Sequence, residues 1–181
     1  MSAIDSHPGN INFLSQNSFR FSIKRLPNIN YFCQGVALPA VSIGAIETPT
    51  PLASIPRPGD RITYDPLVIR FRVDENLQNY LEIQKWIEGM GHPEDLQQTT
   101  DIAKRIRNEQ IGFRPLTATV NFVSDGVLSI LTSNKNLNKN VFFRDCFPVN
   151  LTELSFDSMN TTVEYLEASV TFRYRRYEIE E

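Results

Sequence analysis

Alternation of apolar and polar residues is the dominant pattern in this 181-residue sequence. Residues 18–24 alternate aromatic or aliphatic side chains with polar ones, and residues 67–73 repeat the pattern. A period of two predicts strands with one buried face, which leaves Arg70 and Arg72 on the less buried face of the second strand. The same pattern predicts further strands at residues 31–37, 117–123, 127–132, 141–147, 151–156 and 163–177.

Turn-forming residues are expected to divide these strands. Pro27 and Asn28 would let residues 31–37 return as the second strand of a hairpin. Asp125 and Gly126 form a dipeptide that is typical of tight hairpin turns. Pro148 is expected to end the strand that begins at residue 141, because proline has no backbone N–H to donate.

One helix is predicted over residues 77–90, where apolar residues recur at spacings of three and four. Asp74 precedes it as a candidate N-cap, with Glu75 in the first turn. Glycines and a proline that follow Trp86 end the pattern. A strand, a cap and an amphipathic helix therefore follow one another between residues 65 and 91.

Residues 37–61 form a long Pro-rich segment. Because most of its prolines cannot sit in a central strand, we expect a long loop. Its apolar residues leave two interpretations open, which are a loop folded onto its own core and an arm that reaches a neighbouring subunit. The residues that such an arm would use are Ile46, Pro49, Pro51, Leu52, Ile55, Pro58, Asp60 and Arg61.

These elements predict a mainly β fold of the α+β class, with two antiparallel sheets in a sandwich or barrel and one flanking helix. Twelve Phe and six Tyr support the sheet assignment. Residues 1–12 are expected to be a flexible N-terminal arm, and residues 13–181 a single domain. No secretory signal or membrane-length apolar run is recognisable, so we expect synthesis in a cytoplasm and no membrane span.

The charge and the reactive residues point away from nucleic-acid binding and catalysis. A net charge of −3 disfavours a general phosphate-binding surface. Arg173 and Arg175 belong to a short basic patch beside several Glu residues, where pairing with another chain or solvation is favoured. Only two histidines are present, and neither Cys33 nor Cys146 lies in a metal-binding motif. Both thiols are interpreted as small buried residues, and whether they are neighbours stays open.

Five blocks of sequence, taken in order, carry a family resemblance. They are residues 32–40 (FCQGVALPA), 58–61 (PGDR), 65–87, 147–157 and 165–174. Together they resemble the tail tube protein family of contractile-tailed bacteriophages, including the related baseplate tube-initiator protein. Residues 92–112 and 134–140 are longer or more polar than that pattern and would be decorations on the outside of a tube.

The resemblance implies a structural virion protein, with no enzymatic activity and no cofactor. Subunits would close into hexameric rings around one continuous inner barrel, and rings would stack into the inner tail tube. Phage DNA would pass through the lumen without specific binding. The implied partners are further copies of the chain and the tail sheath, baseplate and tail-terminator proteins, joined in the host cytoplasm. Arg70, Arg72, Arg173 and Arg175 would be inter-subunit or surface charges.

The sequence leaves two alternatives open. A baseplate tube initiator, which templates the first ring, shares the blocks described above. A small-ligand-binding β-barrel or an enzyme would use the same strands around a pocket.

Overall fold

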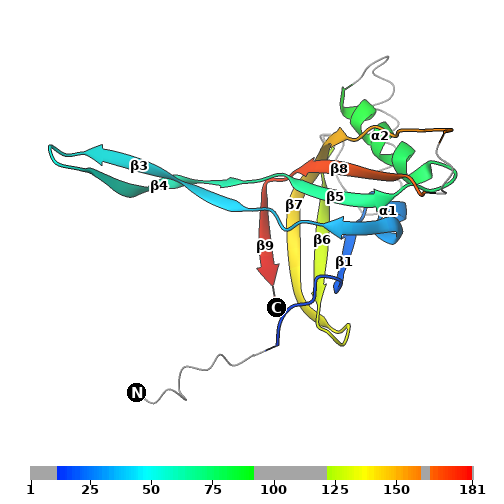
Figure 1. Ribbon diagram of the computed structural model, residues 1–181, viewed down its shortest axis with the longest axis horizontal. Helices are drawn as coiled ribbons and strands as arrows, with labels where there is room; N and C mark the ends of the chain where they lie inside the picture. The colour runs from blue at the N-terminus through cyan, green and yellow to red at the C-terminus, as the bar shows by residue number, and fades with distance from the viewer. Residues whose placement is uncertain (1–11, 92–121, 160–163, 181) are drawn as a thin grey trace, which may run out of the picture.

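The computed structural model describes residues 12–91, 122–159 and 164–180, which form nine strands and two helices (Figure 1). Predictions for residues 1–11, 92–112 and 117–121 lie outside the described residues. The elements are β1 (Phe19–Ile23), α1 (Pro27–Phe32), β2 (Cys33–Val36), β3 (Val41–Pro49), β4 (Ser54–Tyr64), β5 (Leu67–Arg72), α2 (Gln78–Gly91), β6 (Ser124–Leu131), β7 (Leu137–Leu151), β8 (Glu167–Arg173) and β9 (Arg176–Glu180).

A single strand, β7, belongs to two halves of the main sheet. Its first part pairs with β6 on one side and β9 on the other, and its last part pairs with β8. We call β1-β6-β7-β9 sheet A and β7-β8-β5-β2 sheet B, and all their pairings are antiparallel. The strands of sheet B cross one end of sheet A in Figure 1. The predicted mainly β fold with antiparallel sheets is confirmed.

The change from sheet A to sheet B occurs at Asp145 of β7. Asp145 has a φ of 56°, the left-handed conformation that bends a strand. Its backbone N–H donates to Oδ1 of Asp125 on β6 at 3.1 Å, and the N–H of Arg175 donates to the carbonyl of Arg144 at 3.0 Å. These bonds satisfy backbone groups that the bend removes from the regular ladder.

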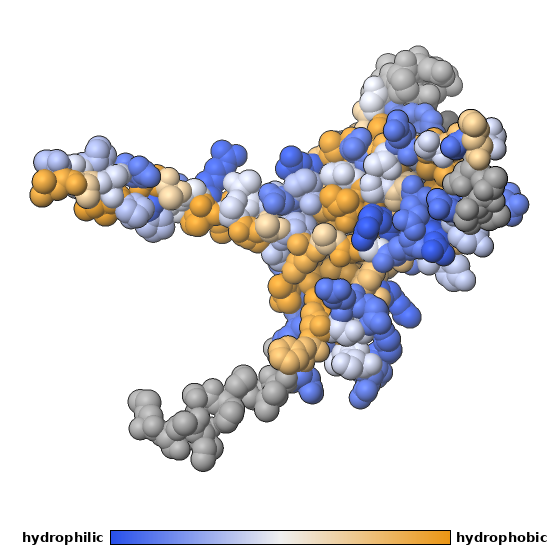
Figure 2. Space-filling view, viewed as in Figure 1, coloured by the Kyte–Doolittle hydropathy of each residue, from blue (hydrophilic) through white to orange (hydrophobic). Residues whose placement is uncertain are grey.

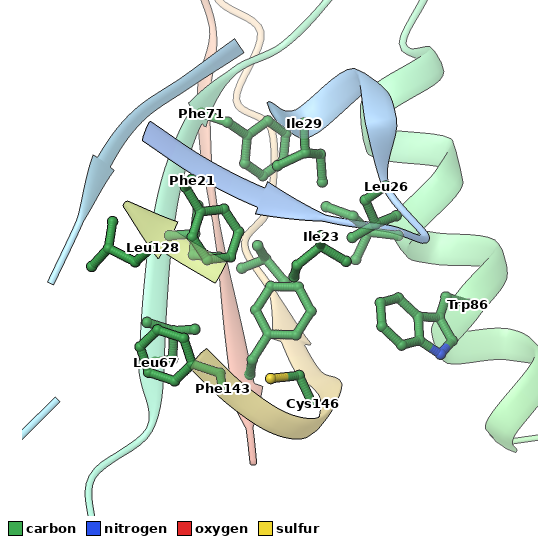
Figure 3. Packing of buried hydrophobic residues seen from close by; sticks show 14 of the residues in the cluster. Phe21, Ile23, Leu26, Ile29, Leu67, Phe71, Trp86, Leu128, Phe143 and Cys146 are labelled. Atoms are coloured by element: carbon green, nitrogen blue, oxygen red, sulfur yellow. The ribbon is translucent and has the colours of Figure 1, made fainter. Parts of the chain in front are cut away.

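The core lies between the two sheets and the two helices. The alternation predicted for β1 and β5 is confirmed, because Phe21, Ile23 and the odd-numbered residues of β5 are buried while Arg70 and Arg72 are exposed. Trp86 of α2 is 3% exposed and points toward the core residues around Ile23 (Figure 3). Its ring lies 6.0 Å from that of Phe172, and its indole N–H donates to the Phe122 carbonyl at 2.8 Å.

The start of α2 differs from the predicted N-cap at Asp74. The helix begins at Gln78, after a turn in which the N–H of Leu77 donates to the Asp74 carbonyl at 2.8 Å. Asn79 takes over the connecting role, since its fully buried side chain donates to the Arg72 carbonyl at 2.7 Å and accepts from the Asp74 N–H at 3.2 Å. A buried amide therefore joins the end of β5 to α2.

Several predicted turns and strands were wrong because tertiary pairing overrides local preference. Residues 27–32 form α1, with Pro27 in its first turn, so β2 pairs with β5 and makes no hairpin with β1. Asp125 and Gly126 lie inside β6 at a register shift. Pro148 remains within β7, also beside a register shift.

The strand ends near the C-terminus also differ from the predicted ones. Residues 152–156 form no strand beyond the last residue of β7. The strand predicted over 163–177 is divided into β8 and β9, since residues 174–175 turn the chain from sheet B to sheet A.

Replacing Trp86 by Ala is expected to lower the free energy of unfolding by about 3–5 kcal/mol, because a buried ring and its hydrogen bond are lost. Urea denaturation followed by circular dichroism measures the change, as the protein has no other Trp. Leu81→Ala, on an exposed position of the same helix, is the control and should cost less than about 1 kcal/mol. A Trp86→Ala protein as stable as this control would contradict the packing described.

Candidate assembly surfaces

The Pro-rich segment is a β-hairpin rather than the predicted loop. β3 and β4 pair only with each other as an antiparallel ribbon that extends away from the body (Figure 1). Pro49, Pro56 and Pro58 face Ser54, Glu47 and Ala45 in that ribbon. The Thr50 N–H donates to the Ala53 carbonyl, so residues 50 and 53 form a hydrogen-bonded pair. Because hydrogen-bonded and non-hydrogen-bonded pairs alternate along an antiparallel ladder, the pairs that contain Pro49, Pro56 and Pro58 are non-hydrogen-bonded. The prolines therefore occupy positions that need no ladder donor, which reconciles them with a strand.

A close contact between the two hairpin strands explains two glycines. The register shifts between Ile43 and Ala45, and Gly44 and Gly59 lie against each other there. A Cβ added to Gly59 would lie 2.6 Å from the Gly44 carbonyl oxygen, closer than atoms can approach. Glycine at 59 therefore permits the bulge that bends the ribbon.

The two faces of the hairpin differ in chemistry. Opposed residues in an antiparallel pair share a face. This rule assigns Val41, Ile43, Ala45, Pro58 and Ile62 to one face, which we call the apolar face of the hairpin. Toward the tip the same face also carries Glu47 and Ser54, whose side chains are joined by a hydrogen bond. The opposite face carries Ser42, Thr48, Thr63 and Arg57 together with Ile46 and Ile55. Figure 2 shows apolar surface along the hairpin and on the adjoining body.

A cluster of aromatic rings holds the base of the hairpin. Tyr64 at the end of β4 lies 6.0 Å from Tyr174 and 5.5 Å from Tyr177, measured between ring centroids. Both of these rings also contact Phe143, at 5.2 and 5.8 Å. The Tyr174 hydroxyl donates to the Asp65 carbonyl at 2.8 Å, and burial raises the pKa of that hydroxyl to about 12. Sequence reasoning missed this cluster, because its members are far apart in the chain.

All residues predicted for the arm belong to this hairpin. All of residues 41–63 except Gly59 are exposed, so the interpretation of a loop folded onto its own core was wrong. Exposed fractions are 99% for Leu52 at the tip and 49–60% for the isoleucines. β3 carries Ile46 and Pro49, the tip carries Pro51 and Leu52, and β4 carries Ile55, Pro58, Asp60 and Arg61.

The four predicted surface arginines divide into two kinds. Arg72 lies 3.9 Å from Glu167, and Arg175 lies 3.9 Å from Asp145, so both have acidic partners within the chain. Arg70 and Arg173 are exposed on sheet B, and among the described residues neither makes an ion pair. Arg70 lies over Gly35, where an added Cβ would be 3.1 Å from the guanidinium.

Sheet A ends in two edge strands, and the sequence pattern did not identify which strands would form such edges. Within the part of the chain that the structure describes, β1 pairs only with β6, and β9 pairs only with β7. Ile179 of β9 is 55% exposed although its register partner Val141 is buried. Unpaired strand edges are templates for pairing with another chain.

The described residues offer little that could perform chemistry. Both cysteines are free thiols, and burial raises the pKa of Cys33 to about 11 and that of Cys146 to about 12, which disfavours the reactive thiolate. Residues 12–91, 122–159 and 164–180 contain no cluster of three or more potential metal ligands. The described helices are all too short or too polar to cross a membrane.

The fold is that of the tubes of contractile injection systems. The tube terminating cap of the anti-feeding prophage has a similar structure, with a TM-score of 0.59, 13% identity and 99% of each chain covered. A chain in the sheath-tube complex of the extracellular contractile injection system PVC has a TM-score of 0.56 and 15% identity, with 99% of this chain and 98% of that chain covered.

Residues 7–180 match the family model described as "Phage tail tube protein". The chain belongs to this family, whose members are structural rather than enzymatic, and it is a structural component of a phage tail. A curated relative, the tail tube terminator protein of Enterobacteria phage T4, is 37% identical over 59 residues. That alignment covers 31% of this chain and 34% of the relative.

Shortening the hairpin should leave the body intact, because the hairpin is exposed along its length. We would replace residues 47–56 by Asn-Gly, which closes the existing pair Ile46–Arg57 with a tight turn. Urea unfolding followed by Trp fluorescence should change by less than about 1 kcal/mol. Tyr64→Ala, at the base, is the contrasting variant and should cost about 1–3 kcal/mol. Loss of folding in the shortened chain would show that the hairpin supports the body.

Proposed function

We propose that this protein is the repeating subunit of an inner tail tube. Copies close into a hexameric ring, sheet A of each copy joins one continuous inner barrel, and rings stack through the hairpin. The tail sheath, baseplate and terminator are its further partners, and phage DNA passes through the lumen. The family membership supports the tail-tube role, and the geometry of sheet A and of the hairpin supports the ring and the stacking contacts.

The observation that carries this proposal is the direction of the two edge strands of sheet A. Neighbouring strands in this sheet are antiparallel throughout, so β1 and β9 run in opposite directions. A second copy, rotated about a ring axis, would place its β1 beside β9 with antiparallel direction as well. The four-stranded sheet can thus continue from copy to copy, which removes both edges and covers Ile179.

The hairpin supports stacking between rings. Val41, Ile43 and Ile62 are each half exposed on its apolar face, and their own body does not cover them. Burying the exposed half of such a side chain stabilises a contact by about 1 kcal/mol. A ribbon that is ordered by cross-strand pairing before it docks also loses less conformational entropy than a disordered arm.

Charges on the outer face of sheet A fit a lumen that does not hold DNA. This face carries Arg144 and Arg176 beside Glu178, and both arginines pair with that carboxylate, at 3.6 and 2.7 Å. Arginines that are paired with a carboxylate attract phosphate groups less strongly than unpaired arginines. DNA could then slide past this surface without specific binding.

A terminator that caps the tube is the second candidate. The 37% identity with the T4 tail tube terminator favours it, although the aligned stretch is short. A terminator would form one ring and resist further stacking, whereas a tube subunit would stack repeatedly. Assembly of the purified protein separates the two.

Negative-stain electron microscopy and mass photometry of the purified protein should show rings of uniform diameter and, at higher concentration, tubes of variable length. Such tubes are expected because an isolated ring leaves its apolar hairpin faces uncovered. Single rings that never stack would support the terminator. A protein that remains monomeric at high concentration would overturn the ring.

Ile43→Asp should abolish stacking while rings persist, because it places a charge on the apolar face of the hairpin. Ser42→Asp is the matched control, since it introduces the same side chain at the adjacent position on the opposite face. Tube length in micrographs and the melting temperature are the two measurements. Normal tubes from the Ile43→Asp protein would remove this face from the stacking contact.

A further inference from the structure

The two edges of sheet A carry opposite free charges on the same face of the sheet. Arg20 of β1 and Lys24 just beyond it are exposed, and no ion pair of either residue occurs within the described part of the chain. Glu180 of β9 is likewise exposed and makes no ion pair there. Arg176 on the β9 edge is already paired with Glu178, so the unpaired charge is basic on one edge and acidic on the other.

These charges lie at the two ends of one row across the sheet. Arg20 is opposite Ser129, Ser129 is opposite Asn140, and Asn140 is opposite Glu180. A hydrogen bond of 2.8 Å from the Ser129 hydroxyl to the Asn140 side chain joins the middle of the row. Residues that face each other across paired strands share a side of the sheet, so Arg20 and Glu180 project from the same surface.

We infer that Arg20 of one copy pairs with Glu180 of the next copy and so selects the β1–β9 joint of the ring. This inference rests on the ring proposed above and names the residues that specify its contact. The occupant of each edge is a second copy of this chain, because the free charge on one edge complements that on the other. A symmetric joint of β1 with β1, or of β9 with β9, would bring like charges together.

The pairing tolerates the stagger that closing a barrel requires. Only shifts of two residues keep each side chain on its own face. If β1 of one copy shifts by two residues along β9 of the next copy, starting from Arg20 opposite Glu180, Arg20 lies opposite Glu178. A shift by two residues in the other direction places Lys24 opposite Glu178. Each of these registers therefore retains a cation beside a carboxylate, while Arg144 and Arg176 hold Glu178 in place.

Charge reversal in the full-length protein tests the inference. We expect Arg20→Glu alone and Glu180→Arg alone each to raise the concentration at which half of the protein is in rings by about tenfold. The double variant Arg20→Glu/Glu180→Arg should restore assembly to near the wild-type midpoint. Mass photometry measures ring and monomer, and melting temperatures confirm that each variant is folded.

Two controls make the result specific. Lys85→Glu reverses an exposed charge on α2, far from both edges in the pairing scheme, and should assemble as wild type. Wild-type assembly should weaken between about 50 mM and about 500 mM salt, because exposed pairs are screened. The neutral variants Arg20→Gln and Glu180→Gln should raise the concentration at which half of the protein is in rings by about two- to fivefold. They test the same contact if a charge-reversal variant does not fold.

The outcomes distinguish this inference from the function on which it rests. Single reversals that assemble as well as wild type, or a double variant no better than either single one, would overturn the Arg20–Glu180 contact and leave the ring standing. A wild-type protein that forms no ring under any of these conditions would overturn the ring and this contact together.

Discussion

The rest of the structure depends on one strand serving two sheets. β7 pairs with β9 only before Asp145 and with β8 only after it, so the left-handed backbone at this residue sets the angle between sheets A and B. That angle creates the space which the core and α2 fill. It also brings the β8–β9 junction next to the end of β4, where the tyrosine cluster forms. A local backbone conformation thereby determines where the hairpin leaves the body.

The hairpin and the edges of sheet A are both surfaces without a partner in the described chain, but they differ in what is left exposed. In the hairpin, apolar side chains remain exposed because no other described element packs on either face of the ribbon. At the sheet edges, backbone groups remain unpaired and free charges stand beside them. The first surface contributes through the hydrophobic effect, which has no direction, and the second through hydrogen bonds and charge, which fix register. The proposed tube uses the second within a ring and the first between rings.

The sequence predicted those elements whose side chains report burial directly. The alternation in β1 and β5 and the spacing in α2 reflect contact with a core, and the structure confirms them. The hairpin gave no such signal, because both its faces are exposed and its prolines fit the non-hydrogen-bonded positions. Asp125 and Gly126 have the residues of a turn but serve the bend at Asp145 from within β6. The charged row from Arg20 to Glu180 could not be predicted, since it exists only once four strands are in register.

The position of the hairpin base along sheet A has a consequence for growth. Tyr64 contacts Tyr177 at one end of the sheet, while the turn between β6 and β7 lies at the other end. In the proposed ring every copy points the same way, so one rim would carry all the hairpin bases and the opposite rim all the turns. The two rims then differ chemically, so each added ring must have the same orientation as the ring below it. Such a tube would be polar, with two different ends, because each subunit has the same orientation along the tube axis.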